Sequence, residues 1–439
     1  MWRRQVNPYR LYLVGLAFGD AFLVSIVTTT SIVYWVTTGH LNPLQLLLLG
    51  TAIEITYFVF QLPTGVLADR VSRRGCIVAG WIITGIGFGM QGFSAAYPNL
   101  LLAQVVVGLG AALGYGATEA WIADELDDAE MTSVYLRGAQ LEIVGVIGGS
   151  LLSGLIALGG LYLPFLIGGG AITLAGVGLA FVMPERNFRG ADSVPVGGVL
   201  KDGWSAFVEQ IGTARRTLVI VPGLALLFGM TFFVGMWSES FDRLWGAFLL
   251  HDFRFPSVGG LRAPLWFSFI ACAVALISLG STEIAKRRTE RLGHASVVGT
   301  LIAVTALMGI GAVLMAVSHV FALAVAAYLL VQAVRPVISP LVTGWMIGRI
   351  EPGVRATALS AKDMFDSGGQ FIGGPVIGVI GNVASIRTAL LAGSAALAPA
   401  VALLAAATRK LRVRPELQVE VTLDEPAPLL PVDGHFHNT

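Results

Sequence analysis

Charged residues are scarce in this chain of 439 residues: only 13% are Asp, Glu, Lys or Arg, whereas 55% are hydrophobic. A soluble domain carries about a quarter charged residues, so the composition excludes an ordinary soluble protein. The few charges are clustered, and several apolar runs between them exceed the roughly 18 residues needed to cross a bilayer. The 54 glycines fit a membrane protein, because glycine lets helices approach closely in lipid.

Cysteine and histidine are also rare, which limits the chemistry that the chain can perform. The two cysteines, Cys76 and Cys272, lie in apolar runs, so neither a disulfide framework nor a metal site is predicted. The six histidines fall in loops, at the ends of apolar runs or in the C-terminal tail. No GxxxxGK phosphate-binding loop occurs, which argues against ATP-driven pumping. We expect that the protein is not an enzyme, uses no cofactor or metal, and binds no nucleic acid.

Apolar runs bounded by charge, proline or glycine predict twelve membrane-spanning helices. They lie near residues 11–36, 43–67, 75–93, 99–123, 138–158, 162–183, 217–238, 264–285, 296–317, 319–342, 357–381 and 388–407. Strands of a membrane barrel would be about ten residues long with alternating polarity, and these runs are longer and do not alternate. The predicted fold class is therefore an all-α membrane protein.

The distribution of Lys and Arg sets the expected orientation. In the twelve-span layout nearly all of them fall on one side, and only Arg243, Arg254, Arg262 and Arg387 fall on the other. Cytoplasmic loops carry the excess of positive residues. An even number of spans places both termini on that side. We therefore predict a multi-pass protein of the plasma membrane with both termini in the cytoplasm, whose first apolar run is retained rather than cleaved.

The chain divides into two related halves. The predicted units are an N-terminal six-helix bundle at 1–183, a cytoplasmic central loop at 184–216, a C-terminal six-helix bundle at 217–407 and a cytoplasmic tail at 408–439, expected to be disordered. ADRVSRRG in the first half matches KRRTERLGH in the second, with Glu290 and Arg291 opposite Asp69 and Arg70. Repeated halves are the usual sequence sign of a secondary transporter.

Charges inside the predicted spans are the candidate functional residues, since a charge in a bilayer costs several kcal/mol, with estimates from about 3 to above 10. Spans three, six, nine and twelve contain none, so we expect these helices to face lipid and the others to surround a polar space. Asp20 and Glu54 fall near the bilayer midplane at a rise of about 1.5 Å per residue. Poorly hydrated carboxylic acids can exchange protons near neutral pH. Asp20 is our first candidate for proton coupling, followed by Glu54, Glu119 and Glu142; the alternative is that each bonds a neighbouring helix.

Two other groups of residues, both in the second half, are candidate functional residues. Arg335 and Asp366, with Asp363 nearby, are predicted to pair on consecutive helices, as a structural or gating pair rather than a substrate site. The segment after span seven is interpreted as an outer gate extending that helix. Its residues are Trp237, Glu239, Phe241, Asp242 and Arg243. Trp237 and Phe241 favour a cavity wall, whereas Trp245 favours an aromatic belt at the membrane surface.

Residues 65–74 read GVLADRVSRR and resemble the signature loop of the major facilitator superfamily, with Ser72 in place of the second glycine. The resemblance implies two pseudo-symmetric six-helix bundles, alternating access, and helices 1, 4, 7 and 10 around a cavity. It also implies a cytoplasmic gate that includes Gly65, Asp69, Arg70, Arg73 and Arg74, together with Glu290 and Arg291. Gly65 would allow a close helix crossing. Asp69 would meet the N-terminus of span eleven, around 355–360, because a helix N-terminus favours an anion.

Further stretches resemble the exporter branch that includes macrolide, tetracycline-like and siderophore efflux proteins. These are EAWIAD at 119–124, SESFDRLW at 238–245, RATALS at 355–360, and the glycine pairs at 148–149 and 373–374. An arginine that this branch carries early in span four is absent, and Gln104 occupies its place.

The leading hypothesis is a proton-coupled antiporter that exports amphipathic small molecules, including drugs, as a monomer. An apolar cavity with few charges suits such substrates, whereas a sugar or phosphate site needs more polar groups. The alternatives are a proton-coupled nutrient symporter, and a lipid flippase or non-transporting scaffold on the same fold. Coupling to sodium instead of protons stays open.

Overall fold

The computed structural model describes residues 6–114, 116–188, 201, 203–205, 208, 212, 222–256, 261–291, 295–347 and 355–413. All regular secondary structure in this part of the chain is helical, which confirms the predicted all-α class. The central loop lies mostly outside the described residues, and so does the tail from residue 414 onward.

The described part of the first half contains ten helical segments. They are α1 (Pro8–Leu11), η1 (Tyr12–Gly19), α2 (Asp20–Thr28), α3 (Ser31–Thr37), α4 (Pro43–Arg70), α5 (Arg73–Phe93), α6 (Tyr97–Gly114), α7 (Ala117–Glu125), α8 (Asp128–Ala157) and α9 (Leu163–Val182). Local sequence explains the sharp starts of α4 and α5. Asn42 and Gln45 form a reciprocal capping box before α4, and the Ser72 hydroxyl accepts a hydrogen bond from the Gly75 N–H at the start of α5.

The second half repeats this organisation. Its described helices are α11 (Pro222–Asp252), α12 (Ala263–Arg291), α13 (Ala295–Val317), α14 (Phe321–Val334), η2 (Arg335–Val337), α15 (Ile338–Ile347), α16 (Arg355–Val383), α17 (Ile386–Ala395) and α18 (Leu397–Val413). Ten segments of the described chain are long and apolar enough to cross a membrane. Helices α11 and α16, of 31 and 29 residues, are long enough but carry several charged side chains. The count of twelve spans stays a prediction.

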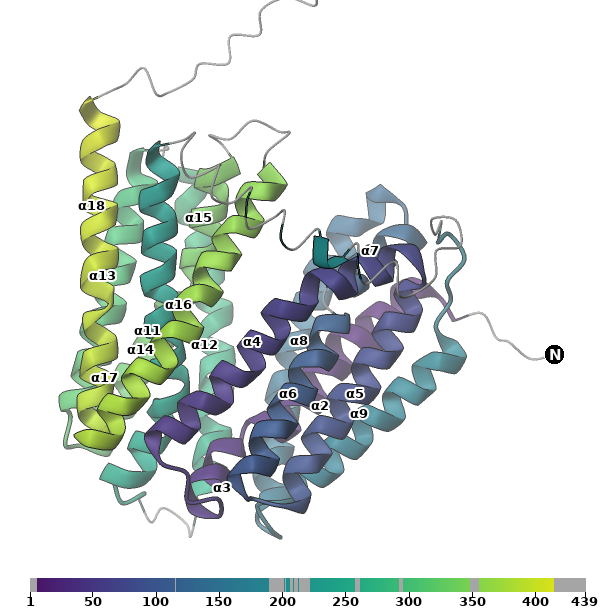
Figure 1. Ribbon diagram of the computed structural model, residues 1–439, viewed down its shortest axis with the longest axis horizontal. Helices are drawn as coiled ribbons and strands as arrows, with labels where there is room; N and C mark the ends of the chain where they lie inside the picture. Colours follow the sequence, from purple (N-terminus) through teal and green to yellow (C-terminus); the bar gives the residue numbers. More distant parts are fainter. Residues whose placement is uncertain are drawn as a thin grey trace, which may run out of the picture.

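The helices form two bundles that lie side by side (Figure 1). Helices α13 and α18 lie at one outer edge of the molecule, and α5 and α9 lie at the other. Large apolar side chains are exposed on three of these helices, among them Ile86 on α5, Leu174 and Phe181 on α9 and Ile310 on α13. That the charge-free spans face lipid stays a prediction.

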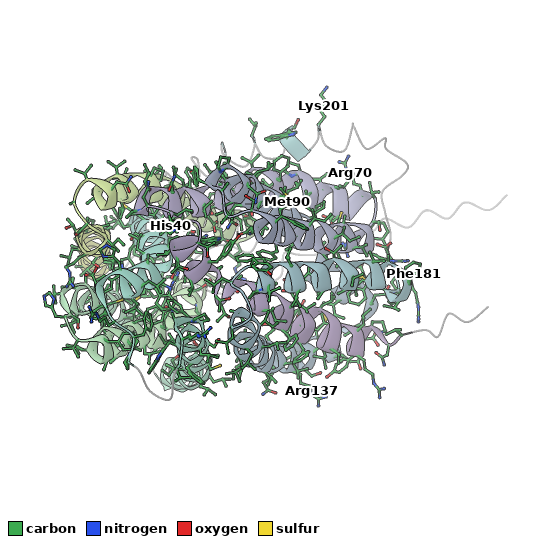
Figure 2. The ribbon with its side chains drawn as sticks, turned by 90° about the horizontal axis from the view of Figure 1, so that it is seen from below. His40, Arg70, Met90, Arg137, Phe181 and Lys201 are labelled. Atoms are coloured by element: carbon green, nitrogen blue, oxygen red, sulfur yellow. The ribbon has the colours of Figure 1, made fainter. Side chains whose placement is uncertain are left out.

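The bundles contact each other near the end of the molecule that carries α3 and α17. The Leu44 N–H of α4 donates to Asn382 Oδ1 of α16 at 3.2 Å. Gly378 and Gly246 allow close packing there, since a Cβ at either would lie 2.9 Å from Leu44 or Ile32 of the opposite bundle. Figure 2 looks along the molecule from below and shows His40 at the junction of the bundles. We call this the closed end, and the end that carries Arg70, Arg73 and Arg74 the arginine-rich end.

Three of the described spans are interrupted within their length by a π-helix, by a glycine with a positive φ or by a 3₁₀ turn. The first span contains the π-helix η1, which passes into α2 at Asp20. The fourth breaks between α6 and α7, where Gly116 has a φ of 71°, a conformation that favours glycine. The span Phe321–Ile347 contains the 3₁₀ segment Arg335–Val337, which includes Pro336. Such irregular turns in membrane helices commonly mark ligand sites.

Candidate transport site

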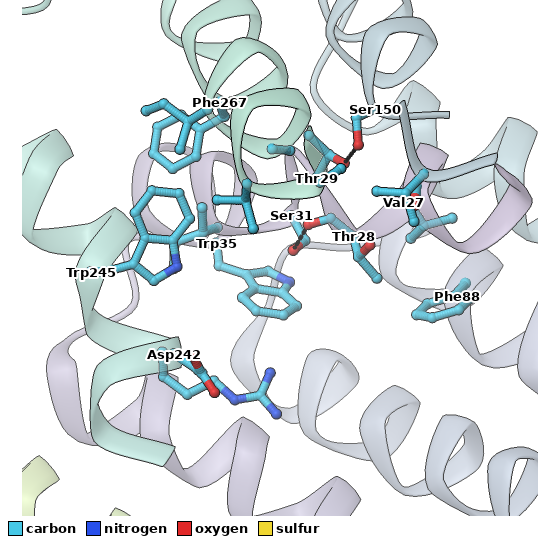
Figure 3. A pocket seen from close by; sticks show the side chains of 18 of the residues that line it. Val27, Thr28, Thr29, Ser31, Trp35, Phe88, Ser150, Asp242, Trp245 and Phe267 are labelled. Carbon is cyan, nitrogen blue, oxygen red and sulfur yellow. Dashed lines mark hydrogen bonds between the residues drawn. The ribbon is translucent and has the colours of Figure 1, made fainter. Parts of the chain in front are cut away.

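A cavity of about 580 Å³ lies between the two bundles and is lined by residues of both. Six aromatic side chains line it. Trp35, Phe88 and Phe165 come from the first bundle, and Trp245, Phe267 and Tyr328 come from the second. Figure 3 shows Trp35 and Trp245 facing the same space, with Asp242 beneath them. We call this the central cavity.

Hydroxyl groups of the first span line another part of the central cavity. Thr28, Thr29 and Ser31 belong to it, together with Ser150 of α8. Thr29 Oγ1 donates to Ser150 Oγ at 2.9 Å, the dashed contact in Figure 3. These groups can hydrogen-bond a polar part of a ligand without adding charge, so the cavity suits compounds with both aromatic and polar surface.

A second cavity of about 540 Å³ lies within the first bundle and holds most of the predicted proton-coupling residues. Asp20, Glu119 and Glu142 line it. Thr28 and Phe88 line both cavities, so the two spaces adjoin. The three carboxylates are exposed to this space rather than packed against neighbouring helices. The structure thus brings these candidates together, and their role in coupling stays a prediction.

Glu54, the other predicted coupling residue, lies apart from them. It faces the charged residues of α11 and interacts electrostatically with Glu239 and Arg243. The two bundles approach closely at this point, because Gly50 of α4 packs directly against the Glu239 carboxylate and the Arg243 guanidinium. Glu54 therefore belongs to the interface between the bundles rather than to the acidic cavity.

The role of residues 237–243 as an outer gate stays a prediction, but these residues lie elsewhere in the helix than the sequence boundary placed them. Helix α11 continues to Asp252, which places Glu239, Asp242 and Arg243 near its middle instead of beyond its end. The predicted span ended at residue 238 because the first charged residue, Glu239, follows it. These charges are compensated inside the protein, since Arg243 Nε donates to Glu239 Oε1 at 3.2 Å, and the Glu239 side chain is only 3% exposed.

The aromatic assignments in α11 are reversed. Trp237 and Phe241, expected in a cavity wall, are buried in the core of the second bundle. Trp245, expected in a surface belt, lines the central cavity and stacks on Tyr328 with ring centroids 4.1 Å apart. The helix rotates by about 100° per residue, so a shift of the assumed span changes which rings face the cavity.

The predicted pair of Arg335 and Asp366 is also wrong. Arg335 forms a bidentate ion pair with Asp242 of α11, in which Nη1 and Nη2 donate to Oδ1 and Oδ2 at 2.6 and 2.7 Å. Asp366 instead accepts a hydrogen bond from Gln370 at 2.8 Å, and Asp363 pairs with Lys362 at 2.6 Å. Because α11 was expected to end at residue 238, Asp242 was not considered as a partner within the membrane.

The signature loop is held together within the first bundle. Arg73 bonds Asp69 at 3.2 Å and the Ala120 carbonyl at 2.8 Å, and it pairs with Asp124. Ser72, which replaces the usual glycine, donates to Glu185 at 2.8 Å, and Glu185 also accepts from the Arg74 backbone. Serine therefore both caps α5 and ties the loop to the end of α9.

The cytoplasmic latch that the resemblance implies is not formed in this conformation. Asp69 makes no hydrogen bond or ion pair with α16 among the described residues. A Cβ on Gly65 would meet open space, so the expected close helix crossing is absent here too. The side chains of Glu290 and Arg291 lie outside the described part of the chain. Both observations fit bundles that are separated at the arginine-rich end.

Sequence reasoning missed several residues of the central cavity. Trp35, Phe267 and Tyr328 lie in ordinary apolar runs, and nothing local distinguishes them from core aromatics. The run TTTS at 28–31 was a usable signal, because four consecutive hydroxyl side chains are unusual in a span.

Comparison with known proteins settles the family. The model of the Major Facilitator Superfamily matches residues 13–309. The chain belongs to this superfamily. One curated relative, an uncharacterized MFS-type transporter of Bacillus subtilis (strain 168) called YxaM, is 27% identical over 124 residues. That match spans 28% of this chain and 31% of the relative, well under two thirds of its length.

Solved transporters share the whole fold at low sequence identity. A nucleoside transporter, NupG, has a TM-score of 0.70 at 14% identity, covering 91% of this chain and 99% of that one. A bacterial homolog of the human lysosomal transporter Spinster, in an inward-facing and unoccupied conformation, has a TM-score of 0.71 at 17% identity, covering 93% and 98%. The peptide transporter POT in complex with sulfate has a TM-score of 0.70 at 15% identity, covering 94% and 97%. The fold of this protein is therefore that of a superfamily transporter.

Proposed function

We propose that this protein is a secondary transporter that exports amphipathic small molecules across the plasma membrane in exchange for protons. The observation that supports the proposal is the central cavity, which both bundles line and which adjoins the carboxylate-lined cavity of the first bundle. A cavity lined by apolar and aromatic side chains with polar groups among them is the usual form of a small-molecule site. Carboxylates beside it supply groups whose proton occupancy can be linked to binding.

The bundles would rock about the central cavity so that it opens to each side in turn. In this structure they touch at the closed end, through Leu44 and Asn382, while the loop around Asp69 is not latched. The cavity would then be accessible from the arginine-rich end, which is cytoplasmic under the positive-inside rule. In this account Asp20 takes up a proton on one side of the membrane and releases it on the other.

Further parts of the proposal follow from the same architecture. Twelve spans, with both termini in the cytoplasm, include α11 and α16 as membrane helices whose charges face the protein interior. Because one chain supplies both bundles and the whole central cavity, a monomer suffices for transport. No cofactor is required.

A proton-coupled symporter is the second candidate, and the position of Glu54 favours it. Glu54 of the first bundle interacts with Arg243 of the second. If a proton neutralises Glu54, its negative charge no longer offsets that of Arg243, and an anionic substrate is attracted more strongly, so the proton and the substrate would bind together. Such linkage drives both in the same direction, whereas competition between them drives exchange.

Substrate-induced proton movement in reconstituted vesicles tests the proposal. Cationic, neutral and anionic amphipathic compounds are added to vesicles that contain a pH-sensitive dye, and the direction of proton flux separates exchange from symport. Asp20→Asn is expected to abolish the flux while the protein still elutes as a folded species. Glu130→Gln, which removes an exposed carboxylate outside both transport cavities, serves as the matched control and should transport normally. Uphill transport by Asp20→Asn on a pH gradient would refute the coupling role.

A further inference from the structure

Arg243 presents a partly open guanidinium to the central cavity. Its Nε is bonded to Glu239, and its two Nη groups make no hydrogen bond with any described residue. The side chain is 23% exposed and lines the cavity, while its partner Glu239 is buried. One edge of the guanidinium is therefore anchored, and the other carries donors without acceptors.

The surroundings fix this orientation. Gly50 of α4 gives the Glu239 carboxylate and the Arg243 guanidinium room to pack against its backbone, where any side chain would collide with them. Both oxygens of the neighbouring Asp242 already accept hydrogen bonds from Arg335, at 2.6 and 2.7 Å. Asp242 lines the same cavity but is engaged by Arg335, so it does not occupy the Nη groups of Arg243.

Aromatic rings stand around the same space. Trp35, Trp245 and Tyr328 line the cavity that Arg243 enters, and the hydroxyls of the first span complete its wall. The parallel N–H donors of a guanidinium can bind both oxygens of a carboxylate, and aromatic side chains can pack against a flat apolar group. Together the two features fit a ligand with a carboxylate at one end and a flat apolar group at the other.

We propose that the central cavity binds compounds with a carboxylate at one end and a flat apolar body at the other, and that Arg243 holds the carboxylate. The inference rests on the proposed function only in taking the central cavity as the substrate site; it does not depend on the direction of transport. Glu54 of the opposite bundle interacts with Arg243 electrostatically but forms no hydrogen bond with it, so the Nη groups stay available to a bound carboxylate.

The test uses three probes with one ring system and different head groups: naphthalene-1-acetate, naphthalene-1-acetamide and 2-(naphthalen-1-yl)ethylamine. Binding to the purified full-length protein is measured by equilibrium dialysis at neutral pH. We expect the acid to bind about tenfold or more tightly than the amide and the amine, because a hydrogen bond to a charged group is worth more than a neutral one.

Variants assign the preference to Arg243. In Arg243→Lys the charge stays but the fork is lost, and the preference for the acid should fall several-fold. In the double variant Glu239→Gln/Arg243→Gln, which leaves no buried charge unpaired, it should disappear. Arg137→Gln removes an exposed arginine outside the central cavity and should keep the full preference. Gel filtration and the melting temperature establish that each variant is folded.

The outcomes separate this inference from the proposed function. Equal or tighter binding of the amide or amine to the wild type, binding of none of the three probes, or an acid preference that survives both Arg243 variants overturns the carboxylate site. The same probes are then added to the dye-filled vesicles. If only the amine causes proton flux, proton-coupled transport is supported and the carboxylate site is refuted. Arg243-dependent acid binding without any proton flux would support the carboxylate site and contradict proton coupling.

Discussion

At the residue scale, the decisive feature is that the charges in the middle of α11 are arranged as two ion pairs. Glu239 pairs with Arg243 along the helix, and Asp242 pairs with Arg335 across helices. The sequence identified all four as candidate site residues. It could not identify the partners, because Asp242 and Arg335 are 93 positions apart and nothing local links them.

The pairing of Asp242 with Arg335 predicts a specific pattern of stability. Asp242→Asn or Arg335→Gln alone leaves one partly buried charge without its partner, which should cost about 1–3 kcal/mol. The double variant removes both charges and should recover much of that loss. Thermal unfolding in detergent measures the three variants in parallel. Additive losses in the double variant would show that the two side chains do not interact.

At the element scale, most helix boundaries follow from the sequence because charge, proline and capping residues mark them, as Asn42 and Ser72 do. The end of α11 does not, since its charges lie inside the helix. The interruptions at η1 and η2 were equally hidden, because π and 3₁₀ turns have no strong local pattern.

Gly50→Ala should impair transport strongly while leaving the apolar cores intact. The added methyl would overlap the Glu239 carboxylate and the Arg243 side chain, so either the ion pair shifts or the helices separate. Gly170→Ala is the matched control, because a methyl at this position of α9 meets open space. Initial rates of transport in vesicles compare the two variants. Normal transport by Gly50→Ala would mean that this close approach is not required.

At the scale of the whole molecule, the fold was predictable and the conformation was not. The signature loop at 65–74 and the long apolar runs lead to the superfamily fold. A sequence carries no information on which of two conformations of similar energy a structure shows. The expected latch at Asp69 is therefore absent here, although the loop itself is formed.

A crosslink at the closed end should stop the cycle. Leu44→Cys and Asn382→Cys place two thiols where the backbone of Leu44 already meets the side chain of Asn382 at 3.2 Å. Both native cysteines are replaced so that no other thiol reacts. Oxidation should abolish transport, and a reductant should restore it. Undiminished transport by the oxidised protein would show that the bundles need not separate at this end.

Alternating access of the central cavity is the central claim, and one measurement tests it most directly. Thr29→Cys, in a chain without Cys76 and Cys272, places a single thiol in the cavity wall. A membrane-impermeant maleimide is applied separately to each face of oriented vesicles. One sample carries only Thr29→Cys. A second sample also carries Leu44→Cys and Asn382→Cys, which are oxidised to form the crosslink before labelling. The account predicts labelling from both faces in the free protein and only from the arginine-rich face in the crosslinked protein. Labelling from a single face in both samples would contradict it.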